Sequence, residues 1–175
     1  MLSLWLYTAF ILATGGERIG ELVTSKRHAA WAFARGGVES GRGHFPAMVV
    51  LHTGLLVGAV AEAWLLGRPF IPLLGWPMLV IALLCQAGRI WIIRSLGQQW
   101  NTRVIVVPGM PLSRRGPYRW GFPHPNYVLV AVEGIAIPLI HTSWITAVTF
   151  TVLNAILLLG FRIPAEDRAL RLAER

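Results

Sequence analysis

Five apolar runs, separated by short polar segments, constrain the fold of this chain more than any other feature of its sequence. Charged residues make up only 14% of the 175 residues, against about 25% in a soluble domain. Backbone amides cannot stay unpaired in lipid, so long apolar runs predict transmembrane helices. We expect a single all-α integral-membrane domain, 1–175, ending in a short C-terminal helix. Its five transmembrane helices are expected at about 2–23, 46–66, 71–96, 126–140 and 144–161.

The basic residues lie between these runs and predict the orientation of the chain. Three segments (17–45, 97–125 and the tail from 162) carry thirteen Lys and Arg residues, whereas the other side of the membrane would carry only Arg68. Cytoplasmic loops are enriched in Lys and Arg. We therefore expect the N-terminus outside the plasma (inner) membrane and the C-terminal helix in the cytoplasm. The net charge of +8 is spread over loops, so it does not indicate nucleic-acid binding.

Two residue types exclude further classes of site. The lone Cys85 lies inside an apolar run, so neither a disulfide within the chain nor a cysteine-based metal site is expected. The five His are scattered without the spacing of metal ligands, and we expect no metal.

The segment from Gly116 to Tyr127 interrupts the helical pattern. Its three prolines, Pro117, Pro123 and Pro125, remove backbone donors and disfavour helix in the residues before them. Irregular backbone at membrane depth persists only where protein or a water-filled cavity satisfies its polar groups. This segment therefore predicts a pocket facing the cytoplasm.

Ionisable residues inside apolar runs are candidates for function or for buried pairs. Glu133 lies two helical turns after Asn126, so both are expected to line the pocket. Glu17 and Glu21 share a helix face, and we interpret them as a charged helix end at the lipid headgroups.

Arg162 and Glu166 lie one turn apart if the fifth helix continues into the tail. The alternative is that Pro164 starts a new helix, with Glu166 in its first turn.

Aromatic and histidine side chains have simpler interpretations. Trp100, Trp120, Tyr118 and Tyr127 are typical of the aromatic belt at a membrane interface. His52, alone in an apolar run, is expected to be a hydrogen-bonded interior residue.

Four motifs resemble the isoprenylcysteine carboxyl methyltransferase family of integral-membrane enzymes, which use S-adenosylmethionine. The motifs are Leu96-Gly97-Gln98-Gln99-Trp100, Gly116-Pro117-Tyr118, His124-Pro125-Asn126-Tyr127, and Arg162-Ile163 with Glu166-Asp167 and Leu170. Residues 17–46 resemble a bacterial branch of the family that is associated with type III polyketide synthases and methylates alkylpyrone or alkylresorcinol hydroxyls. Two positions depart from the family pattern: Pro123 stands where Arg is usual, and Asp167 replaces the second Glu.

The resemblance implies a cytoplasmic S-adenosylmethionine site built from 97–127 and 154–170. Expected cofactor contacts are Gln98, Val106, Val107, His124, Asn126, Tyr127, Arg162 and Glu166. Arg103 and Glu133 are expected to act on the reacting oxygen, with Trp100 and His52 beside the substrate. The acceptor would be a lipophilic molecule that enters from the membrane lipid, and a type III polyketide synthase would be a functional partner.

Two alternatives stay open at this point. One is an NADPH-dependent membrane reductase of the sterol-reductase type, which would need a longer chain. The other is a non-catalytic membrane subunit or small transporter, which would not need the Arg162–Glu166 pair. A homodimer through the spans is compatible with each of these functions.

Overall fold

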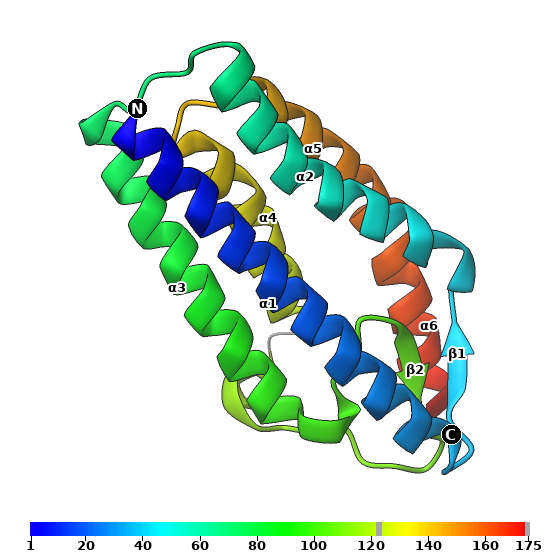
Figure 1. Ribbon diagram of the computed structural model, residues 1–175. Helices are drawn as coiled ribbons and strands as arrows, with labels where there is room; N and C mark the ends of the chain where they lie inside the picture. Colours follow the sequence, from blue (N-terminus) through cyan, green and yellow to red (C-terminus); the bar gives the residue numbers. More distant parts are fainter. Residues whose placement is uncertain (122–123, 174–175) are drawn as a thin grey trace.

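A computed structural model of the chain describes residues 1–121 and 124–173, which are mostly helical. Five long helices run roughly along one another, with two short strands at the end where α1 and α3 finish (Figure 1). The elements in order are α1 (Leu2–Phe33), β1 (Val38–Ser40), η1 (Arg42–His44), α2 (Phe45–Leu65), α3 (Pro72–Leu96), η2 (Gly97–Gln99), β2 (Val104–Val106), η3 (Gly116–Trp120), α4 (Pro125–Leu139), α5 (Trp144–Leu157), η4 (Leu158–Arg162) and α6 (Ile163–Ala173).

Three helical stretches among the described residues are long and apolar enough to cross a membrane: Arg42–Leu65, Pro72–Gln99 and Trp144–Arg171. The shorter apolar helix α4 lies among them. These are features of a multi-pass membrane protein. Helix α1 is not one of the three, because Glu17, Arg18 and Glu21 interrupt its apolar sequence. The fifth span and the orientation therefore stay predictions.

Two sequence-based expectations are corrected by the structure. Helix α1 continues to Phe33, although its span was expected to end near residue 23 and 26–45 was expected to be a loop. Packing stabilises the last turns of α1, because the side chains of Ser25, Ala29 and Ala32 are buried against the rest of the protein. The fold is also not purely α-helical, because β1 and β2 pair in antiparallel fashion with Glu39 opposite Ile105. Such pairing between distant segments leaves no periodic signal in a three-residue strand.

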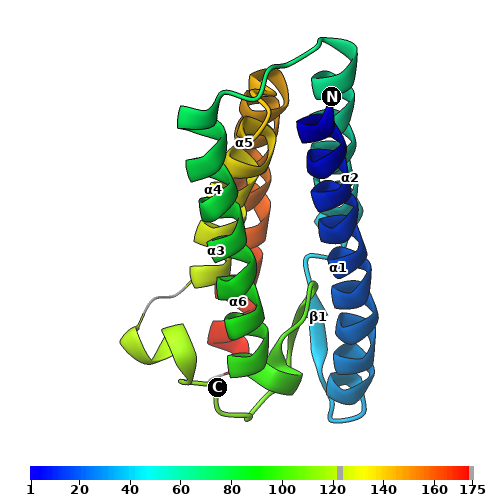
Figure 2. The same cartoon turned by 60° about the vertical axis from the view of Figure 1, so that its left-hand side comes forward.

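The helices pack in an open ring. Helix α3 packs on α4, α4 on α5, α5 on α2, and α2 on α1. Figure 2 shows α1 and α2 on one side and α3, α4 and α5 on the other. The core at the N-terminal end of the molecule is rich in alanine, with Ala59, Ala63, Ala82 and Ala136 almost fully buried. Small side chains allow close approach of the helix backbones.

Glu62 joins two helices at the end of the molecule farthest from the strands. Its carboxylate accepts hydrogen bonds from the backbone nitrogens of Ile145 and Thr146, at 3.2 and 2.7 Å. These are unpaired donors in the first turn of α5, where a negative charge also complements the helix dipole. Arg68 donates to the same carboxylate at 2.9–3.0 Å. Glu62 thus fixes α2 against the start of α5.

Gly134 offers a test of the packing between α4 and α5. A Cβ atom at this position would overlap the ring of Phe150, which is only 2% exposed and has little room to move. We expect Gly134→Ala to destabilise the protein by about 1–3 kcal/mol through overpacking. The readout is a lower thermal unfolding temperature in detergent. Gly54→Ala is the matched control, because nothing lies within 4 Å of its added Cβ. Equal unfolding temperatures for the two variants would contradict this packing.

Candidate functional site

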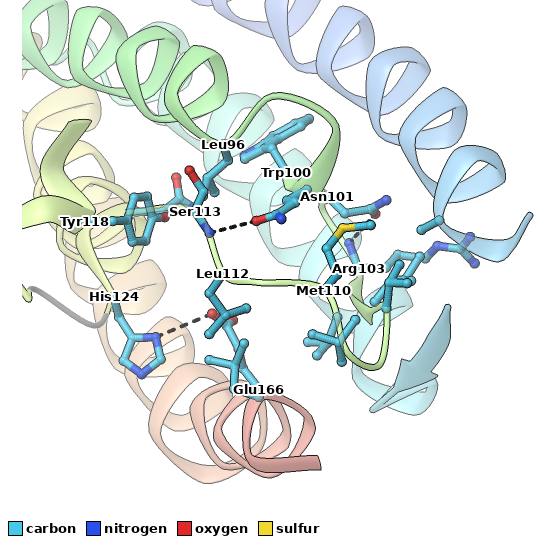
Figure 3. A pocket seen from close by; sticks show the side chains of 18 of the residues that line it. Leu96, Trp100, Asn101, Arg103, Met110, Leu112, Ser113, Tyr118, His124 and Glu166 are labelled. Atoms are coloured by element: carbon cyan, nitrogen blue, oxygen red, sulfur yellow. Dashed lines mark hydrogen bonds and ion pairs between the residues drawn. The ribbon is translucent and has the colours of Figure 1, made fainter. Parts of the chain in front are cut away.

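A cavity of about 520 Å³ lies at the strand end of the molecule, and we call it the loop cavity. Its walls come from the 98–114 segment, the start of α4 and the turn between α5 and α6. Figure 3 shows Tyr118 and His124 on one side of it and Trp100, Asn101 and Arg103 on the other. The structure therefore brings together residues expected at the cofactor or substrate: Gln98, Trp100, Arg103, Val106, Val107, His124, Asn126, Tyr127, Arg162 and Glu166 all line it.

A chain of polar contacts joins α4 to α6 in this cavity. Arg162 Nε donates a hydrogen bond to the Tyr127 hydroxyl at 2.9 Å, and that hydroxyl donates to the Glu166 carboxylate. Arg162 and Glu166 also form an ion pair at 3.9 Å. His124 lies between two carboxylates, 3.5 Å from Glu166 and 3.1 Å from Asp167.

The helix continues from α5 into α6, as one of the two alternatives expected. The other alternative also holds in part, because α6 begins at Ile163, with Pro164 and Glu166 in its first turn. The continuity depends on a π-helical turn, Leu158–Arg162. A proline inside an α-helix removes one backbone hydrogen bond and crowds the preceding turn. The wider π turn lies directly before Pro164, and such turns often occur at functional sites. It leaves Arg162 only 6% exposed, with its side chain facing α4.

A second cavity of about 790 Å³ lies between α1 and α2, and we call it the helix cavity. Apolar side chains such as Ile11, Leu56 and Val60 dominate its lining. The two cavities share five lining residues, Trp100, Asn101, Asn126, Tyr127 and Arg162, which we call the junction. The two cavities therefore lie next to each other, on either side of these five residues.

Several polar atoms at these cavities have no hydrogen-bond partner among the described residues. They include Asn126 Oδ1 and Arg162 Nη1, both of them shielded from solvent. Buried polar groups are nearly always paired in folded proteins. The junction therefore offers both donors and an acceptor to a bound polar molecule.

His52 and Glu133 lie apart from the loop cavity. His52 lines the helix cavity, its Nδ1 lies 2.8 Å from the Met48 carbonyl oxygen, and its ring packs edge-on against Phe150. The expectation of a hydrogen-bonded interior histidine is confirmed. Glu133 lines neither cavity, because its carboxylate turns toward α1 and accepts a hydrogen bond from Arg18. Its expected place in the pocket beside Asn126 is wrong.

Three residues that were expected at the membrane interface are buried inside the protein instead. Trp100 and Tyr127 are only 4% and 8% exposed, and they belong to the junction rather than to an aromatic belt. Trp120, at 63% exposed, is compatible with a belt. Glu21 is 7% exposed and binds Arg89 through both carboxylate oxygens, so it is not a headgroup residue.

Two residues of the site were not anticipated from the sequence. Asn101 lines both cavities and is held by α1, with its side chain hydrogen-bonded to Ser25 at 2.8 and 3.1 Å. Glu39 on β1 is nearly buried and accepts hydrogen bonds from Arg42 and Arg103 at 3.0 and 3.2 Å. Arg103 thus lines the loop cavity with its charge already paired. Pro123, the other departure from the family motif, lies outside the described residues.

The charges around His124 make the stability of the site depend on pH. Glu166, together with Asp167, raises the pKa of His124 above its usual 6.5. A raised pKa in the folded state adds stability that is fully present below about pH 6.5 and is lost as pH rises through the folded pKa. We expect wild type to exceed His124→Gln in thermal stability at pH 6, with a difference that shrinks toward pH 9. Unfolding curves in detergent across this pH range measure the difference in stability. The contributions of the other histidines cancel, because both proteins contain them. A difference independent of pH would contradict a charged His124.

Comparison with known proteins gives the family. The model of the isoprenylcysteine carboxyl methyltransferase (ICMT) family matches residues 78–172, more than half of the chain. The chain is also 34% identical over 168 residues to "Uncharacterized protein YpbQ" of Bacillus subtilis (strain 168), covering 95% of this chain and 96% of that protein. No solved structure matches. The matched region contains most of the loop-cavity lining, and the relative extends the similarity over α1 and α2. The chain therefore belongs to the isoprenylcysteine carboxyl methyltransferase family, whose members are membrane methyltransferases that use S-adenosylmethionine.

Proposed function

We propose that this protein transfers a methyl group from S-adenosylmethionine to an acidic hydroxyl or carboxylate of a lipophilic acceptor. The observation that carries the proposal is the pair of cavities, one with a charged wall and one largely apolar, that meet at the junction. Both volumes lie within the range of about 300–1,000 Å³ that is usual for small-molecule sites. A methyl transfer between a polar cofactor and a lipid-like acceptor needs two such sites in contact.

The loop cavity fits the polar cofactor. The amino-acid end of S-adenosylmethionine carries a positive ammonium group and a negative carboxylate. Arg162 offers a cation to the carboxylate, and Glu166 offers an anion to the ammonium group. Arg162 Nη1 makes no hydrogen bond in the described structure and would gain a partner on binding. Val106 and Val107 supply apolar surface for the adenine, and Gln98 lies at the same wall. When bound, the cofactor supplies an electrophilic methyl group on sulfur.

The helix cavity fits the tail of the acceptor. Its rim carries Leu12, Ile19 and Val57, which are between 62% and 71% exposed and would face lipid. An opening between α1 and α2 would admit a tail sideways from the bilayer. The polar head would then lie at the junction, against Asn126, Tyr127 and Arg162.

The chain would accelerate the reaction mainly by alignment. The enol of a pyrone or a carboxylic acid is already largely ionised near neutral pH, so these acceptors need no strong general base. The residues at the junction hold the resulting oxyanion in line with the methyl group and exclude water. Alignment of two reactants can lower a barrier by up to about 7–11 kcal/mol.

We also propose five spans with the loop cavity in the cytoplasm. The ends of α1 and α3, both strands and α6 lie at one end of the molecule, and most basic residues lie there too (Figure 1). This grouping supports the orientation expected from the positive-inside rule. A polyketide-type acceptor with an alkyl tail, made by a type III polyketide synthase, is the class that the N-terminal resemblance favours.

The decisive test is binding of S-adenosylhomocysteine to the purified protein in detergent. We expect saturable binding by wild type and at least tenfold weaker binding by Glu166→Ala, because a charge-assisted hydrogen bond contributes about 1.5–3 kcal/mol. Calorimetry measures both. Glu62→Gln is the matched control, because it alters a buried carboxylate that lines neither cavity. If well-folded wild type does not bind, the proposed function fails, and NADPH is the next ligand to test.

A further inference from the structure

Two exposed tryptophans from different elements pack together near the end of α3, and we call them the tryptophan pair. Trp91 on α3 and Trp120 on η3 are 46% and 63% exposed, and their rings meet edge-on with centroids 5.9 Å apart. Figure 2 shows η3, in yellow-green, on the side of the bundle away from α1 and α2. Tryptophan near the end of a spanning helix typically lies at the depth of the lipid headgroups.

A close fit of η3 against α3 fixes the tryptophan pair. Gly116, the first residue of η3, has a φ of +57°, and a Cβ atom there would overlap Ser95 Oγ on α3. Only glycine permits both this backbone conformation and this close approach. Pro117, the next residue, is buried. The tryptophan pair is therefore one surface built from two elements.

Two arginines flank the tryptophan pair. The guanidinium carbon of Arg119 lies 4.7 Å from the centre of the Trp120 ring. Arg94 follows Trp91 by three residues on α3, so both lie on one face of that helix. Both arginines are exposed, and neither forms an ion pair within the described part of the chain. A guanidinium that stacks on a ring keeps the donors at its edge available for an anion.

The surrounding sequence supplies no negative charge. The segment 63–132 contains arginines but no Asp or Glu. Arg68, Arg89 and Arg103 in this segment pair with carboxylates from other parts of the chain. Arg94 and Arg119 have no such partner among the described residues, so their counter-charge is expected to come from another molecule.

An apolar line on α3 leads away from the tryptophan pair. Leu84, Val80 and Leu73 precede Trp91 by 7, 11 and 18 residues, which places all four side chains on one face of the helix. All four are exposed. A soluble anion could use the arginines but not this apolar line, whereas a phospholipid has both an anionic headgroup and acyl chains.

Two other arginines stack on tryptophan and provide a comparison. Arg68 lies 5.3 Å from the centre of the Trp144 ring, but its charge is paired with Glu62 at 2.9 Å. Arg35 lies 4.4 Å from the centre of the Trp31 ring, but Trp31 lines the loop cavity instead of an outer face. The stacked arginine beside the tryptophan pair differs from both, because its charge and its ring are free on the outside of the bundle.

We propose that Trp91, Arg94, Arg119 and Trp120 bind the headgroup of an anionic phospholipid, and we call them the lipid site. The two guanidinium groups donate hydrogen bonds to the phosphate, the indole rings lie beside the glycerol, and an acyl chain follows the apolar line of α3. Anionic lipids attract basic residues at the cytoplasmic surface of a membrane. Binding at the lipid site does not depend on the proposed methyl transfer.

The lipid site and the loop cavity share η3. Tyr118, two residues before Trp120, lines the loop cavity. A lipid that holds η3 against α3 would therefore also hold this part of the cavity wall.

The test is a competition between phosphatidylglycerol and phosphatidylcholine with identical acyl chains, added in equal amounts to the whole protein in detergent. Native mass spectrometry counts the lipids that stay bound. We expect wild type to retain one phosphatidylglycerol with a preference of about tenfold or more, because each basic residue near an anionic headgroup adds to the attraction. In Arg94→Gln/Arg119→Gln, which changes two exposed side chains, we expect the preference to fall below about threefold.

A matched variant separates a site from diffuse attraction by the net charge. Arg27→Gln/Arg35→Gln removes two exposed positive charges at the same end of the molecule but away from the lipid site. We expect it to keep the wild-type preference. Equal losses in the two double variants overturn the proposal, and so does a wild type that binds both lipids alike.

Two further measurements test the geometry and the source of the phosphate. Gly116→Ala changes no charge but forces η3 away from Ser95, so we expect the preference for phosphatidylglycerol to fall. An unchanged preference would contradict a site built from two elements. Soluble glycerol 3-phosphate is expected to leave the bound lipid in place. Its displacement of the lipid at equal concentration would identify a site for free phosphate esters and overturn the proposal.

Discussion

The contact of Tyr127 with Arg162 and Glu166 is the interaction on which the site depends. It joins the first turn of α4 to the π turn and to α6. The rest of α4 and all of α5 lie between these two parts of the chain. Without it, nothing else in the described structure would orient Arg162 toward the junction. The site also needs the π turn. It lets the helix continue through Pro164 and keeps Arg162 and Glu166 one turn apart.

The rest of the loop cavity is held by the N-terminal half of the chain. Pairing of β1 with β2 places Glu39 beside Arg103, and Ser25 of α1 fixes Asn101. The side chains that meet the loop cavity are thus positioned by segments more than sixty residues away. A change in α1 or β1 can therefore alter the geometry of the site without touching any motif residue.

The sequence predicted the parts of the site that depend on local spacing. Arg162 and Glu166 are four residues apart, and the prolines around His124 mark a break in the helices, so both features are visible without a structure. Contacts between distant segments were not visible. Glu133 has the correct spacing from Asn126, yet the nearby Arg18 determines which way its carboxylate points. Glu21 resembled a headgroup residue because its partner, Arg89, lies 68 residues away. The strands were missed for the same reason.

The two cavities are built from different parts of the chain. The matched family region, 78–172, contains most of the loop cavity, including His124, Arg162 and Glu166. The helix cavity is built largely from α1 and α2, which precede that region. Residues of α1 and α2 that line only the helix cavity, such as Ile11 and Leu56, leave the lining of the loop cavity unchanged when they vary. Two buried ion pairs cross the boundary of the matched region: Arg18 pairs with Glu133, and Glu21 pairs with Arg89. The wall of the helix cavity therefore depends on contacts between both parts of the chain.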